Sequence, residues 1–219
     1  SHTRWLFSFT SKREMFGMLS KTHFAVGLAT SLVIIQPKTF NECAVAVIGG
    51  TVGGVLADND ILDNDYQADA LIGQLLALGS AVLALVLDCI LGFGICESVI
   101  NKPVLPIIGG IGFIALYIIG FCSDHRTFTH SFLAMIFYTI AAALIYTPLA
   151  IALGAAYLSH LLLDILNKKK VPVLYPLEFG ICFKMCYANK TANKVFMYIG
   201  FAISGLLFIV GIITSFVGS

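Results

Sequence analysis

The sequence predicts an all-α, polytopic membrane bundle, and three observations support this prediction. Hydrophobic residues make up 58% of the 219-residue chain, and its mean hydropathy is +0.93. Charged residues make up only 11%, against about 25% in soluble domains. The apolar residues gather into about seven long runs. A soluble domain with one anchor is therefore excluded, and the net charge of +1 gives no sign of a nucleic-acid partner.

The apolar runs set the expected helices. They lie at about 24–36, 43–57, 71–95, 103–122, 131–147, 149–166 and 195–217. A membrane-spanning helix needs roughly 17–25 residues, so the last five runs suffice or nearly so. The first two are short, and we expect them to form a tilted hairpin or to be lengthened by flanking residues. The glycine-rich stretch 49–54 suits close packing of membrane helices, because small residues let backbones approach.

Two regions are expected along the chain. Residues 1–17 are interpreted as an N-terminal extension, and residues 18–219 as a single membrane domain. The first four residues, 1–4, resemble a cloning or protease remnant, so the histidine among them is set aside. No secretory signal is predicted, and Met15 or Met18 is the expected native start.

Several polar residues and cysteines are expected to lie outside the main site. Most of the six cysteines are interpreted as small hydrophobic residues rather than as a disulfide framework. Cys182 and Cys186 are four residues apart and are weighed as extra metal ligands. Asp88 is interpreted as an interfacial or helix-pairing residue, and Glu97 and Lys102 as parts of a short outer loop.

The distribution of Lys and Arg predicts the orientation. With seven spans, one membrane face carries the N-terminus and residues 58–70, 123–130 and 167–194, and with them eleven of the thirteen Lys and Arg. The opposite face carries Lys38 and Lys102. Because cytoplasmic loops are enriched in Lys and Arg, the first face is predicted to be cytoplasmic. We expect a multi-pass protein of the bacterial inner membrane.

Four distant segments bring histidines and aspartates to this predicted cytoplasmic face. Ionisable groups at the mouth of a membrane span are costly to place and by default mark a functional site. We predict the following residues as metal ligands: His23, Asp58, Asp60, His125, His130, His160 and Asp164. The oligomeric state stays open.

The spacing of these residues supports a shared site. His160 and Asp164 are four apart, so both can reach one metal from one helical face. The alternative is a histidine bonded to a neighbouring helix and a helix-end charge. Asp58 and Asp60 follow a span directly, where a loop can present both carboxylates; the alternative is a solvated acidic loop.

His125 and His130 can reach one site only if a turn precedes the helix that follows them. His125 and His130 are five apart, roughly 140° around an ideal helix, so one helix would not aim both inward. We expect a turn that ends in an N-cap at Thr127 or Thr129, with His130 in the first helical turn.

Such ligands predict hydrolytic chemistry. Imidazole with carboxylate suits Zn²⁺ first, with Mn²⁺ or Fe²⁺ as alternatives, and the ligand number allows one to three ions. Such a site lowers the pKa of bound water toward neutrality. Arg126 is a planar cation suited to a phosphate, or else an anchor at the cytoplasmic face. Asp124 is predicted as a base or as a residue behind the ligands. Lys168 and Lys169 are expected to contact anionic head groups, or to form an ordinary positive loop.

Four segments carry a family resemblance. They are 23–27, 56–60, 125–131 (HRTFTHS) and 159–164 (SHLLLD). In this order they resemble the LexA-regulated, membrane-bound metal-dependent hydrolases, also called YdjM-like inner-membrane proteins, over residues 18–180. Ala57 departs from the family's usual proline but removes no ligand.

The resemblance implies a metal-dependent hydrolase. The order His, Asp, His, HxxxD is also similar to that of zinc-dependent phospholipase C and P1-type nucleases, which favours phosphoester chemistry. We therefore expect a phospholipase-like hydrolase acting on a membrane lipid or lipid-linked ester. The alternative is a metal or ion transporter, or a metal-stabilised membrane scaffold. Against transport, no matching set of ligands lies at the bilayer midplane.

Overall fold

A computed structural model describes residues 18–61, 64–124, 126–167, 170–177, 179–183 and 191–217. Within these ranges all regular secondary structure is helical, apart from one isolated β-bridge between Val171 and Ile181. The helices are α1 (Ser20–Ile35), α2 (Phe40–Val55), the 3₁₀-helix η1 (Leu56–Asp60), α3 (Asn64–Leu91), α4 (Ile95–Asn101), α5 (Val104–Phe121), α6 (Phe132–Ile145), α7 (Thr147–Ile165) and α8 (Thr191–Val217). The all-α prediction is confirmed.

Each of the seven apolar runs forms a helix, and five helical stretches are long and apolar enough to cross a membrane. They are Phe40–Asp60, Gln67–Leu91, Val104–Phe121, Thr147–Ile165 and Thr191–Val217. Helices α1 and α6 are apolar but shorter, with 16 and 14 residues. The short helix α4 stands where a plain outer loop was expected. The result is a polytopic helical bundle.

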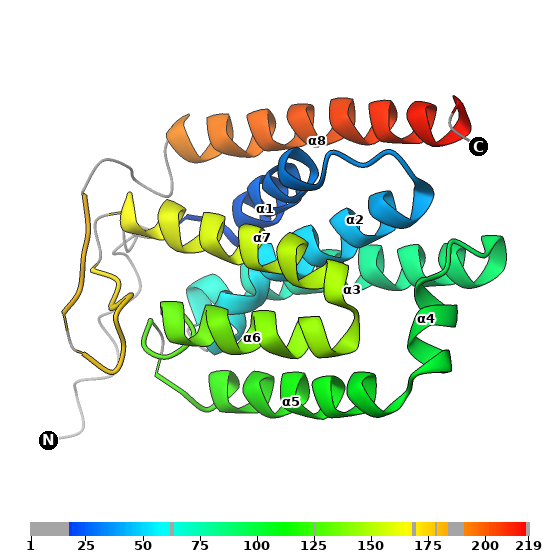
Figure 1. The fold of residues 1–219 in the computed structure, drawn as a ribbon. Helices are drawn as coiled ribbons and strands as arrows, with labels where there is room; N and C mark the ends of the chain where they lie inside the picture. Colours follow the sequence, from blue (N-terminus) through cyan, green and yellow to red (C-terminus); the bar gives the residue numbers. More distant parts are fainter. Residues whose placement is uncertain are drawn as a thin grey trace, which may run out of the picture.

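The long helices run back and forth between two ends of the molecule (Figure 1). The connection between α5 and α6 lies at one end, together with the C-terminal end of α7. Helix α4 and the C-terminus of the chain lie at the other end. This arrangement brings segments that are far apart in the sequence to the same end.

Helix α2 packs against both α1 and α7, and glycines permit both approaches. A Cβ on Gly27 of α1 would lie 2.6 Å from the Cα of Gly54 of α2. A Cβ on Gly53 would lie 2.5 Å from the carbonyl oxygen of Leu153 of α7. Real Cβ atoms do not come this close, so these positions accept only glycine without a shift of the helices. Both alternatives expected for the first two runs are present: α1 and α2 pack as a close hairpin, and flanking residues lengthen the second run to Phe40–Asp60.

The start of α6 differs from the prediction. Ser131 is the N-cap, and its hydroxyl accepts a hydrogen bond from the N–H of Ala134 at 3.2 Å. The predicted cap at Thr127 or Thr129 is therefore wrong. His130 lies in the turn before α6 rather than in its first helical turn. The turn leaves His130 free of helical geometry, so its ring can point into the bundle.

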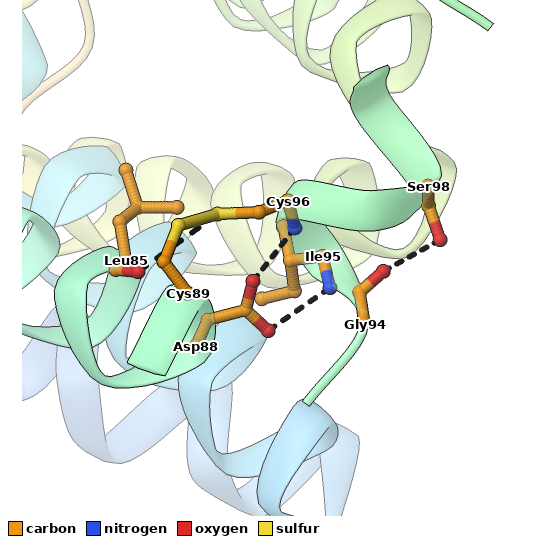
Figure 2. The surroundings of a disulfide bond; sticks show 7 residues. All are labelled: Leu85, Asp88, Cys89, Gly94, Ile95, Cys96 and Ser98. Carbon is orange, nitrogen blue, oxygen red and sulfur yellow. Dashed lines mark hydrogen bonds between the residues drawn. A yellow bond between two sulfur atoms is a disulfide. The ribbon is translucent and has the colours of Figure 1, made fainter. Parts of the chain in front are cut away.

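The far end of the bundle is held by a carboxylate and a disulfide (Figure 2). Asp88 is buried and accepts hydrogen bonds from the N–H groups of Ile95, at 2.9 Å, and Cys96, at 2.6 Å, in the first turn of α4. Cys89 and Cys96 form a disulfide. The interpretation of cysteines as small hydrophobic residues does not apply to this pair. Cys182 is a free thiol, and Cys186 lies outside the described residues.

Candidate metal centre

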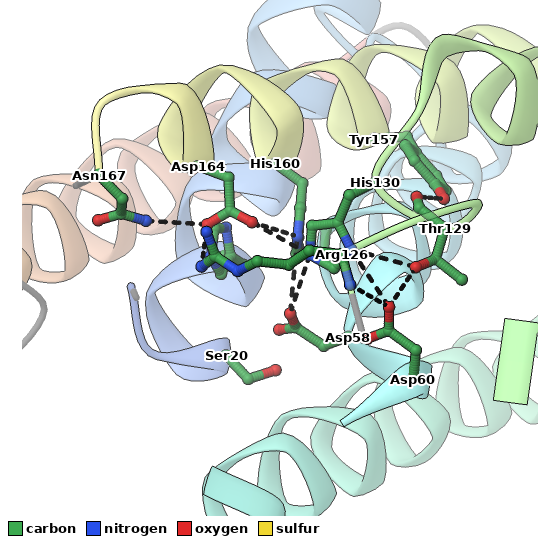
Figure 3. Close-up of polar contacts among 12 residues, drawn as sticks. Ser20, Asp58, Asp60, Arg126, Thr129, His130, Tyr157, His160, Asp164 and Asn167 are labelled. Carbon is green, nitrogen blue, oxygen red and sulfur yellow. Dashed lines mark hydrogen bonds and ion pairs between the residues drawn. The ribbon is translucent and has the colours of Figure 1, made fainter. Parts of the chain in front are cut away.

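Five buried His and Asp side chains meet near the end of the bundle where α7 terminates (Figure 3). Their ligand atoms form two overlapping groups, each within 4.8 Å. The first group is His23, His160 and Asp164, and the second is Asp58, His130 and His160. Helix α1, the 3₁₀-helix η1, the turn before α6 and helix α7 each supply at least one of them. The predicted convergence of four segments is present, and His160 belongs to both groups.

The orientation of His160 is fixed by the backbone of α2. Its Nδ1 lies 2.8 Å from the carbonyl oxygen of Gly54. A carbonyl only accepts, so Nδ1 carries a proton, and in the neutral imidazole Nε2 then keeps its lone pair. Nε2 is buried, has no hydrogen-bond partner among the described residues and lies 3.6 Å from Asp58 Oδ1 and 3.7 Å from Asp164 Oδ2. Metal-binding histidines are held in this way, with one nitrogen bonded to the protein and the other facing the metal.

Asp164 lies at the centre of the cluster. Its Oδ2 is 3.1 Å from Nε2 of His130, and its Oδ1 is 3.6 Å from Nε2 of His23. The side-chain amide of Asn167, one turn later, donates a hydrogen bond to Oδ1 at 2.9 Å. Nη2 of Arg126 also lies 3.6 Å from Oδ1. These contacts hold the carboxylate with both oxygens directed at the other site residues.

Asp60 takes a different position from Asp58. Its Oδ2 accepts hydrogen bonds from the hydroxyl of Thr129, at 2.5 Å, and from the backbone N–H of Arg126, at 3.0 Å. The same oxygen lies 3.4 Å from Nδ1 of His130. Asp60 belongs to neither ligand group. It was predicted as a ligand, but it stands behind His130, where a carboxylate orients a metal-binding imidazole.

His130 is held between two carboxylates. Complete burial lowers the pKa of its imidazole, but hydrogen bonds to Asp164 and Asp60 outweigh burial and raise the pKa to about 10. In the metal-free protein His130 therefore carries a proton that partly balances the acidic cluster. A metal ion that binds here must displace that proton, as is general for histidine ligands.

Arg126 reaches into the site from an unusual backbone conformation. Its φ is +64°, in the left-handed region that non-glycine residues rarely adopt. The hydrogen bond from its N–H to Asp60 helps to hold this conformation. Its side chain is only 11% exposed, and Nε and Nη1 are buried with no hydrogen-bond partner among the described residues. Buried unpaired donors are costly, so this guanidinium is suited to an anionic group that enters the site.

Some predicted site residues are not brought into the cluster. The side chain of Asp124 is exposed and belongs to neither ligand group. His125, Lys168 and Lys169 lie outside the described residues, so their predicted roles stay predictions.

Three supporting residues were missed by sequence reasoning. Asn167 and Thr129 bond directly to the site carboxylates. The hydroxyl of Tyr157 donates to the carbonyl of Thr129 and so ties α7 to the turn that carries His130. The only sequence signal was position. Tyr157 precedes His160 by three residues on the same side of α7, and Asn167 follows Asp164 by three, just beyond the end of that helix at Ile165.

The fold and the cluster define a polytopic helical membrane protein with buried His and Asp residues at one end. The family model described as YdjM inner membrane protein matches residues 18–217, so this chain belongs to the YdjM inner membrane protein family. The match confirms the resemblance and supports a multi-pass location in the inner membrane. LexA regulation stays an expectation. Comparisons with curated proteins and with solved structures found no match.

Proposed function

We propose that this protein is a metal-dependent hydrolase that cleaves an ester, preferentially a phosphoester, of a lipid-like or membrane-delivered substrate. The observation that carries the proposal is the orientation of His160. Its Nδ1 is bound to the Gly54 carbonyl, and its Nε2, which has no hydrogen-bond partner in the part of the chain that the structure describes, faces buried carboxylates. Beside it, Arg126 directs buried donors into the same space.

The residues present fit a divalent transition metal. His23, Asp58, His130, His160 and Asp164 would hold it. Their mixed imidazole and carboxylate set favours Zn²⁺, with Mn²⁺ or Fe²⁺ as alternatives. Asp58, Asp60 and Asp164 are all buried, so the cluster has an excess of negative charge that a cation offsets. Two ligand groups that share His160 are compatible with one ion or with neighbouring ions. When bound, the metal supplies Lewis acidity that polarises the ester and activates water.

Side chains of the protein bind the substrate, accept the proton and orient the metal-binding residues. The Arg126 guanidinium binds the anionic group of the substrate and stabilises the negative charge that develops on it. The Oδ2 atom of Asp58 is buried without a hydrogen-bond partner among the described residues, and it accepts the proton of the attacking water. Asp124 was predicted for this role, but its side chain is exposed, so Asp58 is better placed. Asp60 and Asn167 keep His130 and Asp164 oriented.

Two independent features support a cytoplasmic location of the site. Eleven of the thirteen Lys and Arg belong to the sequence segments assigned to the same face as the site residues. The Cys89–Cys96 disulfide lies at the opposite end of α3, and disulfides persist in oxidising compartments such as the periplasm. The ligands gather near one end of the bundle, whereas transporters bind their ions near the bilayer midplane.

The test is turnover by purified protein in detergent or liposomes. Zinc-loaded protein is screened by mass spectrometry against phospholipids, polyprenyl phosphates and acyl esters, with Asp164→Asn as the matched control. We expect chelator-sensitive hydrolysis of a phosphoester that Asp164→Asn abolishes. Zinc-loaded protein that hydrolyses none of these substrates would overturn the proposal. Transfer of metal ions across the liposome membrane would then indicate a transporter. A protein that neither hydrolyses these substrates nor transfers metal ions would be a metal-stabilised scaffold.

A further inference from the structure

A groove of about 330 Å³ lies beside the candidate metal centre, between α3 and α5 and against α2 and η1. Its sides are apolar and include Val52 of α2, Ala77 and Leu78 of α3, and Phe113 of α5. The groove reaches η1, which supplies Leu56 and Asn59 to its lining, and the half of α5 next to the α5–α6 connection, which supplies Phe113 and Tyr117. The groove is therefore on the same side of the bundle as the metal centre.

The groove is continuous with the membrane-facing surface. Leu78 and Tyr117, which line it, are both exposed. The outer faces of α3 and α5 consist of large exposed hydrophobic residues, and both helices are long and apolar enough to span a membrane. In a bilayer these faces contact lipid chains, so the groove opens sideways into hydrocarbon rather than into water.

The inner end of the groove is polar and adjoins the metal centre. Asn59 lines this end and stands between Asp58 and Asp60 in η1. Its side-chain amide donates to the carbonyl of Tyr117 at 2.9 Å. Gln74, also in the lining, donates to the backbone carbonyl of Asp58 at 3.3 Å. The groove thus ends on the turn that presents the Asp58 carboxylate to the ligand cluster.

We propose that this groove binds one hydrocarbon chain of a lipid phosphoester while its head group occupies the candidate metal centre. The position of the head group rests on the proposed function, whereas the position of the chain rests on the groove. Lipid tails are as apolar as the groove, so entry brings little hydrophobic gain. The groove acts mainly by alignment, because it fixes where the head group of a bound lipid must lie.

The test uses phosphatidic acid that carries a diazirine near the end of one acyl chain, mixed into phosphatidylcholine liposomes with the zinc-loaded protein. Light fixes the probe to its neighbours, and mass spectrometry maps the labelled peptides. The blocking variant is Leu78→Trp. The matched control is Leu75→Trp, on the same helix, because Leu75 is 57% exposed against 61% for Leu78 and does not line the groove.

We expect labelling to concentrate on peptides that contain Val52 and Phe113, and to fall several-fold in Leu78→Trp but not in Leu75→Trp. Tyr117→Trp, a second blocking change at an exposed position, should act like Leu78→Trp. If labelling is spread evenly over the exposed faces of α3 and α8 and both blocking variants leave it unchanged, the groove does not bind the lipid chain, even if the protein hydrolyses lipids. Specific labelling without any hydrolysis by the wild-type protein would support lipid-chain binding in the groove and contradict the proposed hydrolase activity.

Discussion

The imidazole of His160 donates from Nδ1 to the carbonyl oxygen of Gly54 at 2.8 Å, across the contact between α7 and α2. Gly54 also allows α1 to approach, because a Cβ at this position would lie 2.6 Å from the carbonyl oxygen of His23. One glycine therefore sets the orientation of one histidine and the position of another. The candidate metal centre depends on close helix packing as much as on its ligands.

Replacing this glycine should disturb both histidines. Gly54→Ala would force α1 away from α2 and is expected to cost about 1–3 kcal/mol of stability, as overpacking does. Zinc content should fall as well. Gly79→Ala is the control, because nothing lies within 4 Å of a Cβ there. Thermal unfolding in detergent and elemental analysis measure the two effects; identical behaviour of the two variants would contradict the proposed role of helix packing.

Metal occupancy is the most direct prediction. Wild-type protein purified without chelator should contain zinc or another transition metal, and His160→Ala or Asp164→Ala should remove most of it. Each change removes a candidate ligand that lies inside the cluster. Asp88→Asn is the control, since Asp88 caps α4 in the corner that holds the disulfide. Elemental analysis that finds no metal in the wild-type protein would refute the metal centre.

Asp60 should influence the affinity for the metal without being a metal ligand. Its Oδ2 lies 3.4 Å from Nδ1 of His130 and also accepts from Thr129. Loss of such an orienting carboxylate typically costs 10–100-fold in metal affinity, so Asp60→Asn should weaken zinc binding by about this factor. Competition with a zinc-sensitive dye measures the affinity, and Glu42→Gln, in the N-terminal turn of α2, is the matched control. A complete loss of zinc would instead make Asp60 a ligand.

The sequence was sufficient for the seven helices that the apolar runs form, but not for α4 or η1, and it was sufficient to place His160 and Asp164 of the cluster on one helix. Long apolar runs predict membrane helices by length alone, and the four-residue spacing places His160 and Asp164 on one face. The turn before α6 was harder, because Thr127, Thr129 and Ser131 are all good N-caps and only tertiary contacts select among them. In the structure the choice falls on Ser131.

The different roles of Asp58 and Asp60 depend on contacts between distant segments. Two residues apart in η1, one carboxylate lies near Nε2 of His160 and the other near Nδ1 of His130. No local pattern contains this information. The Cys89–Cys96 disulfide likewise depends on the turn between α3 and α4, which brings together cysteines that composition alone left as small hydrophobic residues.

The orientation of the protein can be tested by labelling in intact cells. Single cysteines at Lys102 and Lys170, both exposed, are introduced after the other free cysteines have been replaced by serine. An impermeant maleimide should modify Lys102→Cys and spare Lys170→Cys until the cells are permeabilised. The reverse pattern would place the metal centre on the periplasmic side and remove the cytoplasmic part of the proposal.

The last prediction concerns the buried guanidinium of Arg126. Two of its nitrogens lack partners among the described residues, and the third lies 3.6 Å from Asp164. If these donors stabilise charge that develops on the substrate, Arg126→Ala should reduce turnover by about 10²–10³-fold, as loss of one such donor does elsewhere. The turnover of Arg126→Lys should lie between those of the wild type and Arg126→Ala, because an ammonium group keeps the charge but not the planar geometry of the guanidinium.

Zinc content should stay at the wild-type level in both variants. Lys21→Ala, which removes a more exposed cation paired with Asp69, should leave turnover unchanged. Loss of zinc together with turnover in Arg126→Ala would show that Arg126 maintains the site rather than acting on the substrate.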